Sequence, residues 1–316
     1  MTNEDFDKLR EQRFAKLSPA KQEYFKKAPG AGLREMGLEK LREVGNSLMR
    51  TAPPVVAEGV TTQDVSVPGP HGPVPMRLYR PTGSAPMGTH FHIHAGGYIL
   101  LGGLGTETTR LSNMARDVGC IIAAPDFRLP PEHKFPIGIE DCWAALQWTS
   151  KNITSHGGDP ARIGVGGGCT GGVVSAVMAL MARDAGVRLR YLYMAATVTD
   201  TREQYRSYYE FANGYTLTKD TANYVTGLYL RDDFDRFDWR ASPVMAPSVK
   251  GLPRTMVVEG EWDVLHDEAQ AWANRLRDAD VNVNFREHKE EGHSFSPEAA
   301  TTAQKEFYEF VRMGLA

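Results

Sequence analysis

The sequence has few cysteines, no excess of either charge and no long apolar run. Its three cysteines, Cys120, Cys142 and Cys169, are odd in number and lack metal-ligand spacing, which argues against a disulfide framework and a zinc site. Lysine and arginine total 36 against 39 acidic residues, for a net charge of −3, and no basic block suits a phosphate backbone. We therefore expect no metal, no cofactor and no nucleic-acid partner.

A membrane association is not expected either. The first residues are acidic and polar, and no later stretch is apolar over the length that a bilayer requires. These features favour a soluble, cytoplasmic protein with no membrane partner. At 316 residues the chain can form one large domain with an added cap, or two domains. No pattern specifies the oligomeric state, so a homodimer stays open.

The hydrophobic pattern divides the chain into segments. Residues 1–55 have a helical period and are expected to form a helical segment that either packs on the core or covers an active site. Residues 56–316 read mainly as strands alternating with helices, which predicts an α/β fold: a mostly parallel sheet wrapped by helices on both faces. Residues 197–241 interrupt this alternation. Their many aromatic side chains either line an apolar pocket or form the core of an insertion.

A short apolar strand runs through glycines into a helix at residues 162–174. The stretch Gly167-Gly168-Cys169-Thr170-Gly171 fits the nucleophile elbow G-x-S-x-G, with cysteine in place of serine. Glycines two residues to either side are needed because a Cβ there would collide with the neighbouring strand or helix. The same stretch also suits a phosphate-binding turn or a buried structural cysteine. Other parts of the sequence are needed to choose among these three interpretations.

The ends of the other predicted strands carry suitable partners. In chain order they present the glycine-rich loop after His94, then Cys169, Asp263 and His293, which is the order of oxyanion loop, nucleophile, acid and base described for α/β hydrolases. Each has an ordinary alternative: Asp263 as a helix cap, His293 as a surface turn residue, the glycines as turns. Their joint occurrence at strand ends favours a Cys169, His293, Asp263 triad.

Three histidines alternate along the strand that precedes this loop. His90, His92 and His94 would share one face, as metal ligands do, but no carboxylate ligand lies nearby in this central strand. We therefore interpret His90 and His92 as structural. His94 and Tyr98, on either side of the oxyanion loop, are expected to contact an uncharged, moderately hydrophobic acyl group.

Over nearly its whole length the sequence resembles the hormone-sensitive-lipase-like branch of the α/β hydrolases, the bacterial carboxylesterases with an H-G-G-G loop and a G-D-S-A-G-G elbow. Residues 126–136, DFRLPPEHKFP, are similar to that family's D-Y-R-L-A-P-E-x-x-F-P, and residues 263–268 resemble its D-P-L-x-D-E acid loop. The resemblance implies the α/β-hydrolase fold, with the backbone amides of Gly96, Gly97 and Thr170 as the oxyanion hole. It also implies a helical cap made of the N-terminal helices and part of residues 197–241.

The chain departs from the family around the nucleophile. Ala95 replaces a loop glycine, and Gly168, Cys169 and Thr170 replace the Asp-Ser-Ala of the elbow. Loss of the carboxylate at position 168 favours a thiolate, and a helix N-terminus with an imidazolium nearby lowers the pKa of a thiol. The sequence therefore predicts hydrolysis of a small ester or thioester through a thioester acyl-enzyme, with His293 moving the proton and Asp263 orienting it.

Several alternatives stay open at this stage. The same residues suit an acyltransferase, and the fold also hosts a lyase or dehydratase and a ligand-binding protein without activity. Cys169 is also what a laboratory replacement of a catalytic serine would leave. The sequence does not identify the substrate, which is an ester, thioester, lactone or amide of unknown acyl size.

Overall fold

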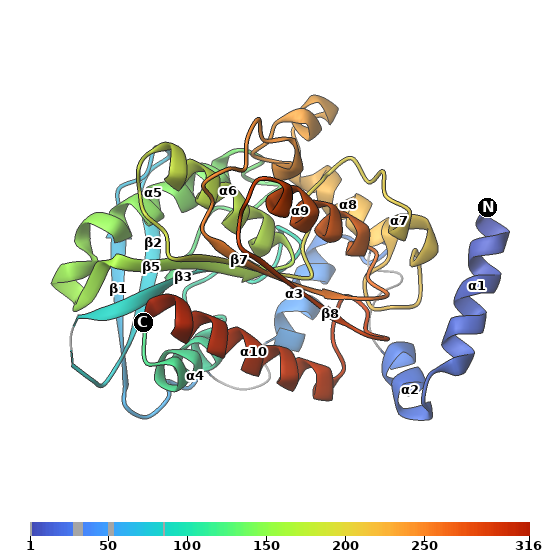
Figure 1. Ribbon diagram of the computed structural model, residues 1–316, viewed down its shortest axis with the longest axis horizontal. Coiled ribbons are helices and arrows are strands. Elements are labelled where there is room, and N and C mark those ends of the chain that lie inside the picture. Colours follow the sequence, from blue (N-terminus) through green and yellow to red (C-terminus); the bar gives the residue numbers. More distant parts are fainter. Residues whose placement is uncertain (1, 28–33, 50–53, 85) are drawn as a thin grey trace.

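An eight-stranded sheet forms the centre of the computed structural model, which describes residues 2–27, 34–49, 54–84 and 86–316 (Figure 1). The strands are β1 (Val60–Val67), β2 (Val74–Pro81), β3 (Met87–Ile93), β4 (Ile121–Pro125), β5 (Gly158–Gly168), β6 (Tyr191–Ala195), β7 (Arg254–Gly260) and β8 (Val283–His288). The α-helices are α1 (Asn3–Lys16), α2 (Pro19–Lys27), α3 (Leu38–Met49), α4 (Thr108–Val118), α5 (Ile137–Asn152), α6 (Thr170–Asp184), α7 (Ser207–Glu210), α8 (Lys219–Tyr229), α9 (His266–Asp278) and α10 (Pro297–Leu315).

The sheet is parallel except at one edge. Its strand order is β1-β2-β4-β3-β5-β6-β7-β8; β1 and β2 pair antiparallel with each other, and so do β2 and β4. All other neighbours are parallel. Helices α5, α6 and α9 cover one face, and α4 and α10 pack together on the other (Figure 1). The predicted parallel sheet with helices on both faces is confirmed, and β3, β5, β6, β7 and β8 all end at one edge.

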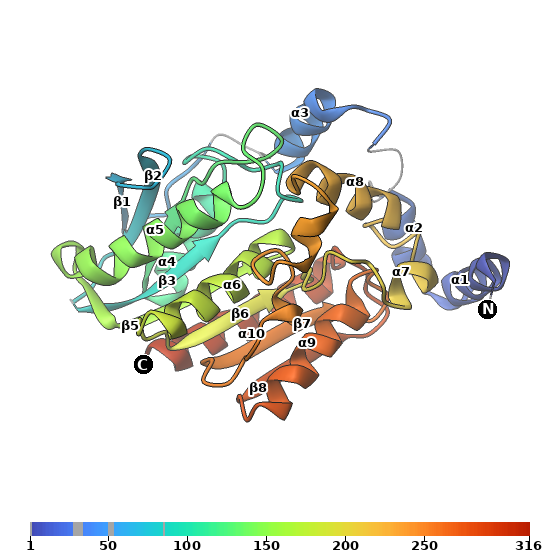
Figure 2. The same cartoon turned by 90° about the horizontal axis from the view of Figure 1, so that it is seen from above.

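Helices α1, α2, α3, α7 and α8 gather at one end of the molecule (Figure 2). One apolar cluster joins α3 to α8 and to the segment after β3 through Leu41, Val225 and Ile99. Another joins the first two helices to the insertion and to the loop after β7 through Leu17, Phe25, Phe211, Tyr215 and Trp262. Of the predicted helical segment 1–55, residues 1, 28–33 and 50–53 lie outside the described residues. The described part packs on the insertion and on loops at the carboxyl ends of β3 and β7.

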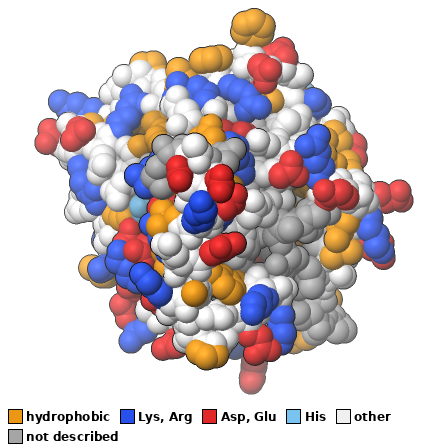
Figure 3. All heavy atoms as spheres, turned by 90° about the vertical axis from the view of Figure 1, so that its right-hand side faces the viewer, with side chains coloured by type: hydrophobic (Ala, Val, Ile, Leu, Met, Phe, Trp, Pro, Cys, Tyr) orange, Lys and Arg blue, Asp and Glu red, His pale blue; other side chains and the backbone are white. Residues whose placement is uncertain are grey.

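The surface at this end carries both charges. Figure 3 shows Lys and Arg side chains interspersed with Asp and Glu there, with hydrophobic side chains in small groups. Within the described part of the chain, no helix combines the length and the apolar character needed to cross a bilayer.

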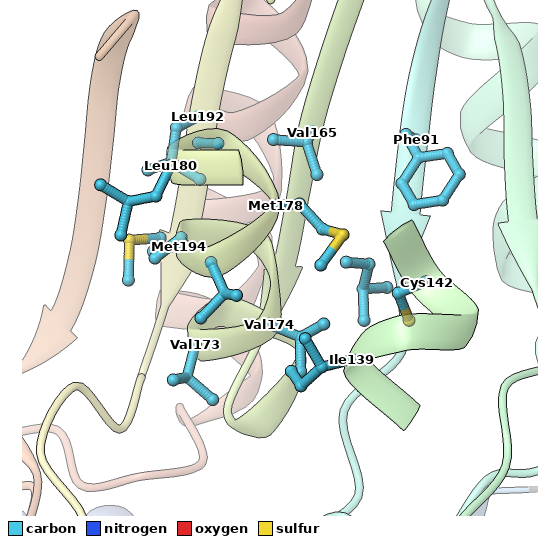
Figure 4. Packing of buried hydrophobic residues seen from close by; sticks show 14 of the residues in the cluster. Phe91, Ile139, Cys142, Val165, Val173, Val174, Met178, Leu180, Leu192 and Met194 are labelled. Atoms are coloured by element: carbon cyan, nitrogen blue, oxygen red, sulfur yellow. The ribbon is translucent and has the colours of Figure 1, made fainter. Parts of the chain in front are cut away.

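Helix α6 is held in the core between the sheet and α5. Its Val174 and Met178 lie among Phe91 of β3, Val165 of β5 and Ile139 of α5 (Figure 4). Burying one such side chain contributes about 1.5–3 kcal/mol, and α6 is buried along most of its length. The position of the first turn of α6, which follows Cys169, is therefore fixed by core packing.

The predicted boundaries differ in places from the observed ones. The apolar run at residues 120–124 predicts a buried strand, and β4 begins at Ile121. The sequence pattern also predicts a helix over about 139–155, and α5 begins at Ile137 and ends at Asn152, followed by a 3-10 turn. Residues 158–160, whose Gly-Asp-Pro sequence predicts a loop, begin β5 because Gly158 pairs with Met87 of β3, across a shift in register. The Gly-Asp-Pro composition resembles a turn, and pairing with the neighbouring strand overrides it.

Candidate active site

Cys169 lies in the sharp turn between β5 and α6. Its backbone has φ 50° and ψ −124°, a conformation that non-glycine residues rarely adopt. The turn is held because the Cys169 amide donates to Ala195 O at 2.7 Å, and the Cys169 carbonyl accepts from the Gly172 amide at 3.0 Å. A Cβ at either Gly167 or Gly171 would lie 2.3 Å from the backbone oxygen of Ile93. The close approach explains why both positions need glycine.

The three residues of the predicted triad come together from distant parts of the sequence. His293 Nδ1 lies 2.8 Å from Asp263 Oδ2, and the same ring hydrogen-bonds to the Cys169 side chain. Asp263 is fully buried, and its Oδ1 accepts the amide of Leu265 at 3.0 Å. The His293 amide donates to Tyr215 O at 3.2 Å, so the insertion holds the histidine loop. Because Asp263 accepts at Nδ1–H, the opposite ring nitrogen is the one available to the sulfur.

The charges of Cys169, His293 and Asp263 shift one another's pKa values. Burial alone would raise the pKa of Cys169, but the charge of His293 and hydrogen bonds from its ring and from the Thr170 and Gly97 amides bring it below the ordinary thiol value. Burial alone would lower the pKa of His293, whereas the charges of Asp263 and Cys169 raise it well above its usual range. Both shifts favour a thiolate–imidazolium pair over a neutral thiol and imidazole.

Two of the three predicted oxyanion donors point at the nucleophile. The amides of Gly97 and Thr170 hydrogen-bond to Cys169, as their effect on its pKa shows. Gly96 instead forms the turn of the loop: its φ is 113°, and its carbonyl accepts the amides of Ile99 and Leu100. A Cβ on Gly96 would lie 2.8 Å from Leu100 O, so the turn requires glycine there. Amides aimed at the sulfur also lie close to where a substrate oxyanion forms.

The structure gives Thr170 a second role that the sequence did not indicate. Its hydroxyl oxygen accepts the amide of Tyr98 at 3.1 Å and is buried. The alanine of the family pattern has no such acceptor. In this chain the residue after the nucleophile thus connects the elbow to the oxyanion loop.

The two predicted substrate-contact residues are both buried. Tyr98 is 4% exposed, has a φ of 65° and stacks on Tyr229 with 3.9 Å between ring centroids. Its hydroxyl group has no hydrogen-bond partner among the residues that the structure describes. His94 stacks on Phe127 at 4.4 Å, and its Nδ1 lies 2.7 Å from Ala95 O. The Tyr98 ring is close enough to Cys169 for the thiolate charge to add to burial and to Tyr229 in raising the pKa of the phenol.

The other two histidines of β3 have structural partners. His90 Nδ1 lies 2.7 Å from Tyr191 Oη, and His92 Nε2 lies 3.1 Å from Glu107 Oε2. Among the described residues, no group of three or more His, Cys, Asp or Glu side chains is placed to hold a metal ion. Cys120 and Cys142 are buried core residues.

A cavity of about 720 Å³ opens beside the elbow, between α4, α10 and the ends of the central strands. The missing side chain at position 168 leaves room on this side, since a Cβ there would have Ala195 O, 3.6 Å away, as its nearest neighbour. The lining residues closest to the elbow and to the oxyanion loop are Gly167, Gly168, Ala195, Ala95 and Leu101.

Sequence reasoning missed two buried polar residues that support the site, Glu259 and Thr197, and included a third, Glu268, only as part of the acid-loop motif. Glu259 and Thr197 lie behind Asp263 and Cys169. Glu268 accepts the amides of Thr199 and Asp200 and the hydroxyl of Tyr208, which fixes the start of the insertion to α9. A carboxylate in a strand of otherwise apolar residues, as at position 259, is the one signal that could have found the first of them.

Comparison with known proteins places this geometry in context. A family model described as alpha/beta hydrolase fold matches residues 90–297. The chain is 36% identical over 237 residues to the carboxylic ester hydrolase LipN of Mycobacterium tuberculosis, covering 72% of this chain and 62% of LipN, less than two thirds of that protein. It is 30% identical over 250 residues to an arylesterase of Saccharolobus solfataricus, covering 78% of this chain and 81% of the relative.

Solved esterase structures share the fold over nearly the full length. A bacterial heroin esterase superposes with a TM-score of 0.89 at 26% identity, covering 96% of this chain and 99% of its own. A thermostable esterase from Pseudomonas putida superposes with a TM-score of 0.87 at 26% identity, covering 95% and 99%. The α/β-hydrolase fold expected from the sequence is thereby confirmed.

Proposed function

This chain is a carboxylesterase-like member of the α/β hydrolases, in their hormone-sensitive-lipase-like branch, and we propose that it hydrolyses small carboxylic esters or thioesters with Cys169 as the nucleophile. The observation that carries the proposal is the hydrogen-bonded line from Asp263 through His293 to Cys169, with two amides at the sulfur. Neither a purely structural cysteine nor a binding protein requires a hydrogen-bonded Asp263–His293–Cys169 arrangement.

In the first half of the reaction the Cys169 thiolate attacks the acyl carbonyl carbon. The new C–S bond yields a tetrahedral oxyanion, which the amides of Gly97 and Thr170 stabilise, with Gly96 shaping the loop. The bond to the leaving alcohol then breaks, and His293 donates its proton to the departing oxygen. The products are a free alcohol and a thioester on Cys169.

In the second half, water resolves the thioester. His293 removes a proton from water, the hydroxide attacks the acyl carbon, and the C–S bond breaks with the electron pair returning to Cys169. The acid leaves and the thiolate–imidazolium pair is restored. Asp263 stays ionised throughout, because burial, which would raise its pKa, is outweighed by the charge of His293 and by hydrogen bonds to the carboxylate.

The acyl substrate is small and moderately hydrophobic in this proposal. Tyr98 and His94 form the wall of the acyl site, and the helices of residues 1–55 together with part of the insertion at 197–241 act as a cap. Support for the cap comes from the contacts of α3 and α8 with the segment after the oxyanion loop.

The decisive experiment combines p-nitrophenyl acetate turnover with intact-protein mass spectrometry. We expect an acetyl adduct on Cys169, and a loss of at least about 10³-fold in kcat in Cys169→Ala. Cys142→Ala serves as the matched control, since it removes a buried thiol that is not part of the triad. Activity that survives in Cys169→Ala without an adduct would exclude the mechanism. Unchanged ligand affinity with no turnover of any ester, thioester, lactone or amide would favour a binding protein.

Tyr98→Phe tests the acyl wall separately. The Tyr98 hydroxyl has no hydrogen-bond partner in the described part of the chain, so its removal should leave the free energy of unfolding within about 0.5 kcal/mol of the wild type. A rise in KM for p-nitrophenyl esters at unchanged stability would support contact with substrate. Kinetic constants equal to those of the wild type would contradict it.

A further inference from the structure

Glu259 is a fully buried carboxyl group at the end of β7, four residues before the triad acid. Its Oε2 accepts the Thr197 amide at 3.2 Å, and its Oε1 accepts the Gly260 amide at 3.2 Å. It has no cationic partner in any ion pair found among the described residues. Burying an ionised carboxyl group without a cationic partner costs free energy of folding, so such a group is stable only if it is protonated or otherwise compensated.

The second feature is its contact with Asp263. The two side chains are hydrogen-bonded, and two carboxyl groups can share a hydrogen bond only if one of them carries a proton. Asp263 is paired with His293, whereas burial and the charge of Asp263 raise the pKa of Glu259 well above its usual range. The two shifts favour placing the shared proton on Glu259, as the donor to Asp263.

The third feature connects Glu259 to the elbow. Thr197, whose amide binds Glu259, also donates its hydroxyl to the carbonyl of Cys169 at 3.0 Å. Two residues earlier, the carbonyl of Ala195 accepts the Cys169 amide at 2.7 Å. Both polar groups of the strained Cys169 backbone are thus held by residues 195–197, and that segment is held in turn by Glu259.

We propose that Glu259 is a positioning residue of this active site, in which one carboxyl group fixes both the acid that orients His293 and the segment that holds the backbone of Cys169. The inference rests on the proposed function, because it presumes that Cys169, His293 and Asp263 act as a unit. Glu259 does not touch the substrate; it acts through Asp263 and Thr197.

The arrangement has a chemical consequence for proton transfer. A neutral donor on Asp263 disperses part of the carboxylate charge, so Asp263 holds the imidazolium less tightly than an isolated carboxylate would. His293 then releases its proton more readily to the leaving alcohol. The ionisable groups that face this region are Asp263, His293 and Cys169, from the loops after β7, β8 and β5.

The test measures the pH dependence of Cys169 alkylation by iodoacetamide, which requires no turnover, together with kcat and KM. In Glu259→Gln the side chain keeps a donor for Asp263 and an acceptor for one of the two backbone amides that Glu259 binds, so we expect a midpoint within about 0.3 pH units of the wild type and a kcat within about threefold. In Glu259→Leu, which is similar in size, we expect a displaced midpoint and a kcat lowered about tenfold or more, with KM changed much less.

Glu261→Gln is the matched control, because it removes a partly exposed carboxylate from the same loop, paired with Lys289 rather than with the triad. It should leave the midpoint unchanged. Thr197→Val covers the case in which Glu259→Leu does not fold: loss of the hydroxyl to Cys169 O should lower kcat without moving the midpoint.

Two results would overturn the inference. If Glu259→Leu has the kcat of the wild type, the contacts of Glu259 with Asp263 and Thr197 have no role in the reaction. Where Glu259→Leu does not fold, a wild-type kcat in Thr197→Val leads to the same conclusion. If Glu259→Gln moves the midpoint downward, Glu259 is ionised in the wild type and contributes charge instead of position, because loss of a nearby negative charge favours the thiolate. Failure of the proposed function looks different, since the wild type itself would form no acyl adduct while its alkylation midpoint could still be compared among variants.

Discussion

The hydroxyl oxygen of Thr170 accepts the backbone amide of Tyr98 at 3.1 Å, which connects the residue after the nucleophile to the loop that carries the oxyanion donors. Both residues are buried, so no solvent replaces this hydrogen bond when it is lost. The relative position of the Gly97 and Thr170 amides depends on it.

Replacement of Thr170 by Val should therefore reduce catalysis. Valine keeps the shape but leaves the Tyr98 amide without an acceptor, which costs about 1–3 kcal/mol of stability and loosens the loop. We expect kcat for p-nitrophenyl acetate to fall about tenfold, less than the 10²–10³ reported when an oxyanion donor itself is removed. Thr170→Ser keeps the hydroxyl and should retain most of the activity. Equal kcat in the two variants would show that the hydrogen bond does not matter.

Features of the site that depend on contiguous sequence patterns could be predicted, whereas features that depend on tertiary contacts could not. The elbow could be predicted because its glycines, its strand and its helix are contiguous in sequence, and Asp263 and His293 because each follows a recognisable strand. Thr170 was assigned only a backbone role, since nothing in the sequence indicates that Tyr98 lies beside it. Glu259 was not singled out, because its partner Thr197 is 62 residues away.

The alkylation rate of Cys169 should report the thiolate–imidazolium pair. Because the pKa of Cys169 is lowered, the rate should be constant above that pKa and fall about tenfold per pH unit below it, with a midpoint under the ~8.5 of a free thiol. In His293→Ala the opposing charge is gone and burial dominates, so the midpoint should move above the ordinary thiol value. Iodoacetamide kinetics followed by mass spectrometry give both midpoints. A wild-type midpoint at or above ~8.5 would contradict the ion pair.

The glycines of the elbow should differ sharply in their tolerance of alanine. In Gly171→Ala the new Cβ would lie 2.3 Å from Ile93 O, a backbone atom that cannot move aside. Alanine favours a helix by about 1 kcal/mol over glycine, but overpacking costs about 1–3 kcal/mol or more, so a net loss of stability is expected. In Gly168→Ala the nearest atom is 3.6 Å away, and the free energy of unfolding should change little. Urea titration of both variants compares them directly, and equal stability would show that the elbow can relax around a Cβ.

The last prediction separates a thioester acyl-enzyme from an oxygen ester. A thioester reacts with amines more readily, relative to water, than an oxygen ester does, so hydroxylamine should divert a larger share of the acyl group to hydroxamate in the wild type than in Cys169→Ser. Cys169→Ser is the matched control because the elbow amides, His293 and Asp263 are retained. The measurement is the ratio of hydroxamate to acid at increasing hydroxylamine. Equal ratios in the two proteins would mean that both share one resolving step, and that the sulfur forms no thioester. A high ratio in the wild type, together with faster ester hydrolysis by Cys169→Ser, would favour acyl transfer over hydrolysis as the reaction for which this chain uses cysteine.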